Sequence, residues 1–198
     1  MSARYGGNTQ SRCPKISQAL VAVHGMDDFM YLNNEMQPVA PSVPCAPGLF
    51  IGREGSQYTT GIKRQLIRLD AKQWLYVGQY QLARSEPAYM TAAEWREQCP
   101  KFHNKWVKNV YAKDWGHKVC ARILTRKRLG REPTEGEVIA TLSEEWFEPK
   151  QVTSDEIKRE FSEGREKLEI FTMKCVGYEN DFQMQLCGMD NWMAERSA

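Results

Sequence analysis

Long apolar runs, histidines and paired-cysteine motifs are all scarce in this 198-residue sequence. No apolar run approaches the ~20 residues that a membrane-spanning helix requires. No basic head followed by an apolar stretch marks a secretory signal, so we expect an intracellular protein without membrane contact. The six cysteines form no CxxC pair, which in such a protein favours free thiols over a disulfide framework.

Sequence motifs for catalysis and cofactor binding are also missing. Gly52-x-x-Gly55 lacks the lysine and the length of a phosphate-binding P-loop, and there is no GxSxG nucleophile motif. Three histidines are few for acid–base chemistry, although carboxylates could serve instead. We therefore expect no cofactor, and a non-enzymatic protein is favoured over an enzyme.

One set of residues could hold a metal ion if the fold brought it together. Two thiols and two imidazoles form a zinc ligand set, and the candidates here are Cys99, His103, His117 and Cys120. Their spacing matches no standard zinc signature, and buried free cysteines are the commoner outcome. We expect no metal and keep the set as an alternative to test.

The net charge of +2 conceals two segments of opposite sign. Residues 101–131 hold ten basic side chains and one acid, whereas residues 132–169 hold twelve acids and five bases. Charge that is separated in this way predicts a partner of opposite sign or pairing between the two segments. The overall composition, 41% hydrophobic and 26% charged, is that of an ordinary globular protein.

Strands and helices are both predicted. Five stretches rich in β-branched and aromatic residues predict strands: Leu49–Arg53, Ile62–Leu69, Trp74–Leu82, Val119–Arg126 and Leu168–Tyr178. Three threonines, each with a glutamate three residues later, predict capping boxes at helix starts: Thr91, Thr134 and Thr153. The recurrence of Phe102, Trp106 and Val110 predicts a fourth helix from Phe102 to Asp114, with Gly116 as its stop.

These elements indicate the α+β class, because strands and helices are mixed without strict alternation. We expect a curved, mostly antiparallel, barrel-like sheet of about five strands with three to four flanking helices. The predicted organisation is an N-terminal extension over residues 1–48, a single domain over 49–188 and a tail over 189–198.

Prolines at positions 38, 41, 44 and 47 recur every three residues, the period of a polyproline II helix. An extended proline-rich arm over residues 38–47 is therefore predicted. Such an arm could bind an aromatic groove on a protein partner. The apolar side chains of Val39, Val43 and Leu49 favour the alternative, in which the arm packs on its own domain.

Aromatic residues are interleaved with the basic residues of segment 101–131, a pattern that suits phosphate contacts combined with base stacking. The predicted nucleic-acid contacts are Lys105, Lys108, Lys113, Trp115, Arg122, Arg126, Lys127, Arg128 and Arg131. The alternative is a solvated face that is neutralised by the acidic segment that follows.

A second aromatic cluster lies in the predicted strand 74–82. Tyr76, Gly78 and Tyr80 would share one face and could form a pocket for a planar base. A glycine inside a strand also marks a bend or a close backbone approach, and we favour this second interpretation.

Residues 24–187 resemble an uncharacterised domain of mushroom-forming (basidiomycete) fungi. The resemblance rests on these motifs: His24–Leu32, Pro47–Phe50, Trp74–Tyr80, Thr91–Trp95, Gly130–Thr134 and Met173–Tyr178. It implies no activity. A weaker resemblance, carried by Tyr76–Leu82 and Arg122–Arg126, is to SRA (YDG) domains. It implies a PUA-like barrel that flips a modified base into an aromatic pocket, although Val77 replaces the aspartate of that motif.

Together these features predict a non-catalytic module that binds nucleic acid, DNA or RNA, and that is nuclear rather than cytoplasmic. Modified-base reading is the narrower form of this hypothesis. The alternatives are a protein–protein interaction module that uses the basic segment 101–131 and a nucleic-acid-processing enzyme.

Overall fold

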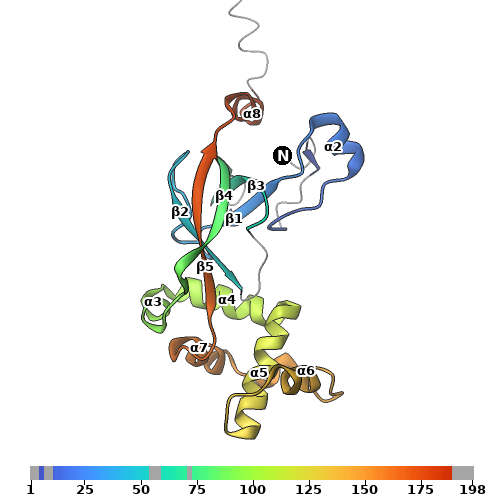
Figure 1. Ribbon diagram of the computed structural model, residues 1–198, viewed down its shortest axis with the longest axis vertical. Helices are drawn as coiled ribbons and strands as arrows, with labels where there is room; N and C mark the ends of the chain where they lie inside the picture. The colour runs from blue at the N-terminus through green and yellow to red at the C-terminus, as the bar shows by residue number, and fades with distance from the viewer. Residues whose placement is uncertain (1–4, 7–10, 54–58, 71–72, 189–198) are drawn as a thin grey trace, which may run out of the picture. The chain divides into compact units, whose positions relative to one another are not determined.

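The computed structural model describes residues 5–6, 11–53, 59–70 and 73–188 (Figure 1). These residues divide into two compact units. Unit 1 comprises the described residues of Met1–Ile51, Gln57–Ser85 and Phe171–Ala198, and unit 2 those of Gly52–Ser56 and Glu86–Ile170. The predicted α+β class is confirmed, with a curled, mostly antiparallel half-barrel sheet of five strands. The described residues contain seven α-helices, more than the three to four expected.

The sheet has the strand order β1-β3-β4-β5-β2. The strands are β1 (Phe29–Asn33), β2 (Gly48–Arg53), β3 (Ile62–Asp70), β4 (Gln73–Tyr89) and β5 (Leu168–Gly177). Four of them confirm the prediction, whereas β1 was not predicted. It lies parallel to β3, with Tyr31 opposite Leu66, and β3 is antiparallel to β4.

Alternating residues of β1 and β3 enter two different hydrophobic clusters in unit 1, as expected for a sheet that is covered on both faces. Met30, Leu32 and Ile67 join the cluster that also contains Phe50, Val77, Tyr80, Leu82, Phe171 and Met173. Phe29, Tyr31 and Leu66 join the other cluster, with Tyr5, Tyr76 and Phe182. The core of unit 1 therefore lies on the two faces of its sheet.

A β-bulge in β4 interrupts the expected alternation. Gln65 lies opposite Gly78 and Leu66 opposite Tyr76, so that Val77 is the extra residue. Tyr76 and Tyr80 consequently enter different clusters, on opposite faces of the sheet. The prediction that they share a face was wrong, because a single inserted residue reverses the side-chain alternation.

Unit 2 contains the helices with predicted capping boxes. The helices α3 (Ala92–Glu97), α6 (Glu135–Leu142) and α7 (Ser154–Ser162) follow Thr91, Thr134 and Thr153, and all three boxes are confirmed. Helix α4 (Pro100–Ala112) buries Phe102, Trp106 and Val110, as the periodicity predicted. The remaining short elements are η1 (Pro149–Gln151) in unit 2 and α2 (Gln18–His24) and α8 (Asn180–Leu186) in unit 1.

The predicted strand Val119–Arg126 is wrong, because this segment is the middle of helix α5 (Asp114–Leu129). A short apolar run suits a strand or a helix equally well. The stop signal of the helix lay further along, where three basic residues precede Gly130. Gly130 is left-handed (φ 67°), and its N–H donates to the Arg126 carbonyl. Gly116 is likewise not a helix stop but a buried residue of α5. The chain changes direction between α4 and α5 (Figure 1).

The proline-rich segment is not the extended polyproline arm that its period predicted. The Ala40 N–H donates to Gln37 and the Ala46 N–H to Val43, which closes two turns. The Gln37 side chain bonds both backbone groups of Ile51, at 2.7 and 2.8 Å. The Cys45 N–H donates to the Val77 carbonyl at 2.8 Å, so segment 38–47 is tied to β4 of unit 1 by a backbone hydrogen bond. A solvated polyproline helix would not make such bonds.

Candidate nucleic-acid interface

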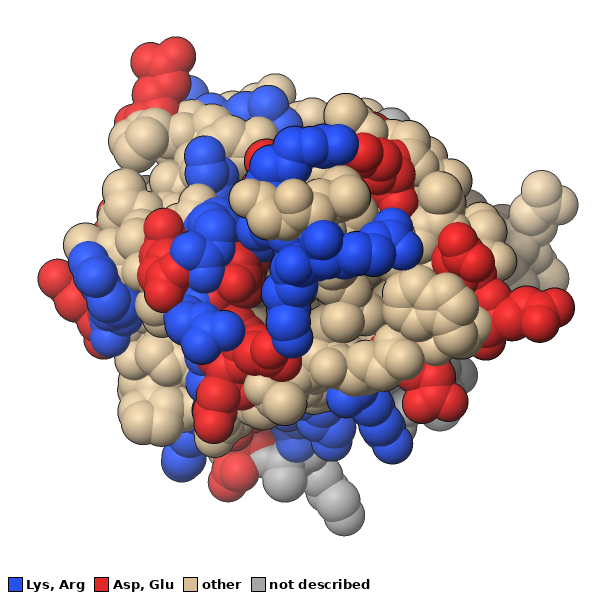
Figure 2. Space-filling model, turned by 90° about the horizontal axis from the view of Figure 1, so that it is seen from below, with Lys and Arg blue, Asp and Glu red and all other residues tan. Residues whose placement is uncertain are grey.

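Acidic side chains lie among the basic ones of the predicted interface. Figure 2 shows Lys and Arg side chains gathered at the centre of one face with Asp and Glu side chains between them. In unit 2, five glutamates pair with arginines and lysines of α5, and Glu137 pairs with Arg131 just after this helix; the five are Glu132, Glu135, Glu156, Glu160 and Glu166. These glutamates therefore neutralise part of the positive charge of segment 101–131 in the folded protein.

Arg126 is the centre of this pairing. Its guanidinium donates to Glu132 (2.7 Å), Glu160 (2.5 Å) and Glu166 (3.1 Å), and its side chain is only 12% exposed. Burial alone would lower the pKa of Arg126, but hydrogen bonds to Glu132 and Glu166 outweigh burial and raise it. Arg165 donates to the other side of Glu160, at 2.7 and 2.8 Å.

Glu166 is the most enclosed acid of this network, with its side chain 1% exposed. Burial raises its pKa, while the guanidiniums of Arg122 and Arg126 act in the opposite direction. Arg122 donates to Glu166 at 2.6 Å. A buried carboxylate requires such partners, because its desolvation is costly. Arg122 and Arg126 thus serve to hold the fold of unit 2.

Other predicted contacts are also paired, but at the surface. Lys127 donates to Glu156 at 2.6 Å, and Arg131 donates to Glu137 at 2.5 Å. Exposed pairs of this kind contribute little, about 0–1 kcal/mol. Arg128 is exposed and lies 3.4 Å from the Thr141 hydroxyl. The pairing expected between the two charged segments is thus observed at Lys127 and Arg131.

A row of lysines remains directed outward from α4. Positions 101, 105 and 108 fall on one face of this helix, and Lys113 follows its last turn. The opposite face of α4 is the buried one. Lys101, Lys108 and Lys113 are exposed and form no ion pair with a described residue. We call Lys101, Lys105, Lys108 and Lys113 the lysine row.

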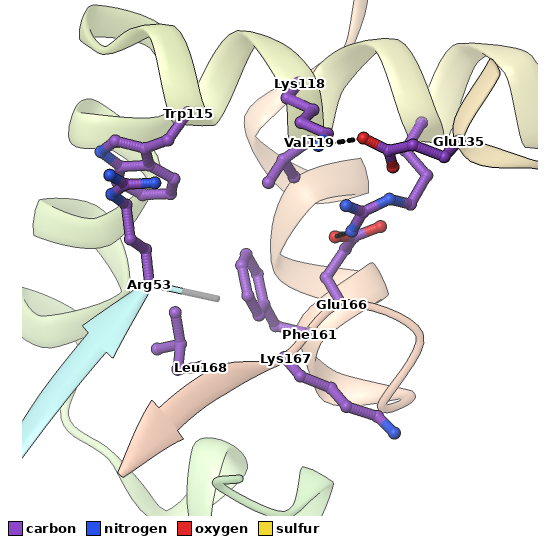
Figure 3. A pocket seen from close by; sticks show the side chains of 10 residues that line it. Arg53, Trp115, Lys118, Val119, Glu135, Phe161, Glu166, Lys167 and Leu168 are labelled. Atoms are coloured by element: carbon purple, nitrogen blue, oxygen red, sulfur yellow. Dashed lines mark hydrogen bonds and ion pairs between the residues drawn. The ribbon is translucent and has the colours of Figure 1, made fainter. Parts of the chain in front are cut away.

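A cavity of about 410 Å³ opens beside α5 within unit 2 (Figure 3). Its lining residues are Arg53, Trp115, Lys118, Val119, Arg122, Glu135, Phe161, Glu166, Lys167 and Leu168. Trp115, Lys118 and Arg122 come from one face of α5, because they are spaced three and four residues apart. Figure 3 shows Arg53 extending toward Trp115, and Lys118 directed at Glu135.

Trp115 and Arg122 are the two sequence-predicted contacts that the fold brings to this cavity. Arg53, Lys118, Phe161 and Lys167 were missed. Lys118 carried a signal, since it lies in the basic segment one helical turn from Trp115. Arg53 and Lys167 lie far from that segment in sequence, at the end of β2 and just before β5, and only the tertiary structure places them there.

The predicted base pocket is filled by the protein itself. Tyr76 and Tyr80 are 1% and 0% exposed. The Tyr76 ring packs on Tyr178 (4.8 Å) and Phe182 (4.9 Å). The Tyr80 hydroxyl donates to the Ala46 carbonyl at 2.7 Å, and burial raises the pKa of this phenol. A ligand therefore has no free ring face to stack on.

The four candidate zinc ligands do not converge. Among the described residues no three His, Cys, Asp or Glu side chains are placed to hold a metal ion. His103 Nε2 lies 2.8 Å from the Trp95 carbonyl, and His117 Nε2 lies 2.9 Å from the Tyr111 carbonyl. Cys120 is buried, and burial raises its pKa to about 12.

The fold and site define an α+β protein with a cationic, aromatic-walled cavity. The sequence model of a family described as "Domain of unknown function (DUF6697)" matches residues 1–189. The chain therefore belongs to this family. No curated protein and no solved structure matched the chain significantly. Within the described part of the chain, no helix has the length and apolar character needed to cross a membrane.

Proposed function

We propose that this protein binds nucleic acid without catalysis, through the lysine row of α4 and the cavity beside α5 in unit 2. The observation that carries this proposal is the lysine row, because its exposed members Lys101, Lys108 and Lys113 form no ion pair with a described residue. The cavity adds Trp115 beside Lys118. Phosphates are recognised by such cations, and unpaired bases stack on aromatic side chains. A nuclear location is expected for such a role.

The lysine row supplies the sequence-independent part of binding. No glutamate in the described part of the chain pairs with its exposed members, so we expect their ammonium groups to contact phosphates. Arg122 and Arg126 are assigned a structural role instead, because both are held by the buried Glu166. Modified-base reading is left out of this proposal, since Tyr76 and Tyr80 are packed in the core. The fungal origin and the SRA resemblance stay predictions.

A salt titration with a matched pair of variants tests the proposal. The first variant replaces Lys101, Lys108 and Lys113 by glutamine. The control replaces Lys150, Lys158 and Lys174, which changes the net charge equally but lies outside the row. Binding of labelled single- and double-stranded DNA and RNA is measured from about 50 to 200 mM salt. We expect the first variant to flatten the log–log salt slope by up to about two to three units, and the control to leave it unchanged.

Two outcomes would contradict the proposal. One is that the wild-type protein binds none of the four nucleic acids at about 50 mM salt, where phosphate contacts are strong. The other is that both triple variants lose affinity equally. The second result would show that net charge, and not the lysine row, drives the association.

A second candidate function is binding of an acidic polypeptide by the same surface. The observation that favours it is that α5 already binds carboxylates of its own chain, at Glu132, Glu156 and Glu160. In the same titration, competition by polyglutamate at equal charge concentration distinguishes the two. Nucleic-acid binding predicts that polyglutamate is a weak competitor, because it offers no bases to Trp115.

A further inference from the structure

Two free cysteines from distant parts of the sequence, Cys45 and Cys175, meet beside β4 in unit 1. The backbone around Cys45 is tied to β4 at two points. The Cys45 N–H donates to the Val77 carbonyl at 2.8 Å, and the Ala46 carbonyl accepts from the Tyr80 hydroxyl at 2.7 Å. These bonds hold Cys45 against the middle of β4, while its side chain is exposed.

Cys175 reaches the same part of β4 from the neighbouring strand. It lies in β5, which is next to β4 in the sheet, and it packs against the hydrophobic cluster that contains Val77 and Tyr80. Its sulfur lies beside Gly78, since a Cβ atom on Gly78 would come within 3.2 Å of Cys175 Sγ. The missing side chain of Gly78 therefore leaves room for this sulfur.

The side chains of Cys45 and Cys175 are hydrogen-bonded to each other. This bond raises the pKa of the Cys45 thiol above its usual 9.0, because it stabilises the protonated form. The Cys175 thiol donates in turn to the Gly177 carbonyl at 3.3 Å, so its sulfur lone pairs can accept from Cys45. Two thiols in this arrangement need only approach from hydrogen-bond contact to the ~2.05 Å of a disulfide.

The backbone of Cys45 gives independent evidence that its position matters. Among the described residues, Cys45 is the only non-glycine with a positive φ, 63°. Side chains disfavour this left-handed region, and residues held in it by their surroundings are concentrated at functional sites. The two hydrogen bonds to β4 hold Cys45 in this conformation. The fold thus keeps an exposed thiol in an unfavourable conformation beside a second thiol.

We infer that Cys45 and Cys175 are a site of reversible disulfide formation, with a low-molecular-weight disulfide such as oxidised glutathione as the oxidant. The exposed Cys45 thiolate attacks the oxidant, forms a mixed disulfide and releases one glutathione thiolate. The Cys175 thiolate then attacks the Cys45 sulfur and releases the second glutathione thiolate. The two cysteines lose two electrons, the oxidant gains two, and the two thiol protons pass to the released thiolates.

The disulfide would join segment 38–47 to β5. All described residues of unit 2 lie between Cys45 and Cys175 in the sequence, so the crosslink closes a long loop. Crosslinks that close long loops restrict the unfolded chain most, and we expect oxidation to stabilise unit 1. Exposed disulfides are the more readily reduced ones, which makes this bond reversible. The lysine row lies in unit 2, so the inference does not depend on the proposed function.

Titration of the full chain with glutathione tests the inference. Reduced protein is incubated with mixtures that contain an increasing share of oxidised glutathione, and is then denatured and alkylated. We expect two of the six cysteines to become protected, and peptide mapping to find Cys45 linked to Cys175. Excess reduced glutathione should restore all six thiols. The thermal midpoint of the oxidised protein should exceed that of the reduced protein by roughly 4–16 °C.

Three variants assign the two thiols. Cys175→Ser should retain one glutathione on Cys45, because no second thiol displaces it. Cys45→Ser should show neither a crosslink nor an adduct on the partly buried Cys175. Cys187→Ser is the control, because Cys187 is another exposed cysteine of unit 1, and it should form the same crosslink with the same midpoint shift. Cys45→Ser changes an exposed residue and keeps the test decisive if Cys175→Ser does not fold.

Three results would overturn the inference. One is that all six thiols remain open to alkylation at every ratio of oxidised to reduced glutathione. Another is a crosslink that joins Cys175 to Cys187 or to any cysteine other than Cys45. The third is a Cys45–Cys175 bond that excess reduced glutathione does not open, which would show a permanent crosslink in place of a reversible one.

Discussion

Gly116 lies directly against the backbone of Val110, at the point where α4 ends and α5 begins. A Cβ atom on Gly116 would come within 2.1 Å of the Val110 carbonyl oxygen and 2.3 Å of its Cα. Real atoms cannot approach so closely, and backbone atoms cannot rotate away. The close approach of the two helices at this corner therefore depends on the missing side chain. It also sets the direction of α5, which carries Trp115 and Lys118 to the cavity.

The first prediction follows from this contact. Gly116→Ala should lower the free energy of unfolding by at least the upper end of the ~1–3 kcal/mol that overpacking costs. Gly136→Ala is the control, because Gly136 lies in α6 with no atom within 4 Å of the added Cβ. That change should stabilise the helix by ~0.5–1 kcal/mol. Chemical denaturation measures both, and equal effects would contradict the close-approach account.

A second prediction concerns Gly78 at the β4 bulge. Its φ of 127° is unfavourable for other residues, and an added Cβ would lie 2.9 Å from the Gly177 carbonyl oxygen. Gly78→Val should destabilise unit 1 by about 1–3 kcal/mol, through strain and overpacking. Gly61→Ala is the comparison, because Gly61 also has a positive φ, 70°, but open space where the Cβ would lie. A Gly78→Val protein with a wild-type melting temperature would show that the backbone does not need this glycine.

The buried ion network gives a third prediction. Removing Arg126 leaves Glu160 and Glu166 without a shared partner in a site where both are buried. Arg126→Met should therefore cost about 3–5 kcal/mol of stability. Lys127→Met, next along the chain but at an exposed pair, should cost less than about 1 kcal/mol. If Arg126→Met keeps the wild-type free energy of unfolding and yet fails to bind nucleic acid, the assignment of Arg126 as a structural residue is wrong.

A fourth prediction concerns acid stability at Glu156. A hydrogen bond from Lys127, together with the Thr153 backbone, lowers the pKa of Glu156 from its usual 4.5 to about 2. A carboxyl whose pKa is lower in the folded state stabilises that state above pH 4.5, and this contribution is lost as the pH falls toward 2. Glu156→Gln should thus destabilise the protein at pH 7, and the difference from wild type should shrink between pH 4.5 and 2. A difference in the free energy of unfolding that stays constant over this pH range would contradict the lowered pKa of Glu156.

A fifth prediction addresses the zinc alternative. Because His103 and His117 are engaged by backbone carbonyls, and Cys120 is a buried thiol of high pKa, we expect no tightly held zinc. Elemental analysis of the purified protein checks this directly. A thermal midpoint that falls on treatment with a chelator, together with one zinc per chain, would restore Cys99, His103, His117 and Cys120 as a ligand set.

Local signals in the sequence determined many of the elements. The capping boxes at Thr91, Thr134 and Thr153 predicted three helix starts, since a hydroxyl and a glutamate three residues apart satisfy the first backbone donors whatever surrounds them. The recurrence of Phe102, Trp106 and Val110 likewise predicted the buried face of α4. Such patterns depend on a single turn or face, which the chain specifies within a few residues.

Tertiary structure alone decided the remainder. Val119–Arg126 suits a strand or a helix, and packing of Cys120, Ala121 and Ile123 in unit 2 selects the helix. The inserted Val77 places Tyr76 and Tyr80 on opposite faces, because alternation along a strand is reversed by one residue. Arg126 pairs with three glutamates from later parts of the chain. Arg53, at the end of β2, likewise lines the same cavity as Trp115 and Lys118 of α5. Charge counting predicts that such pairing can occur, but only the fold determines which cations are neutralised and which still face a ligand.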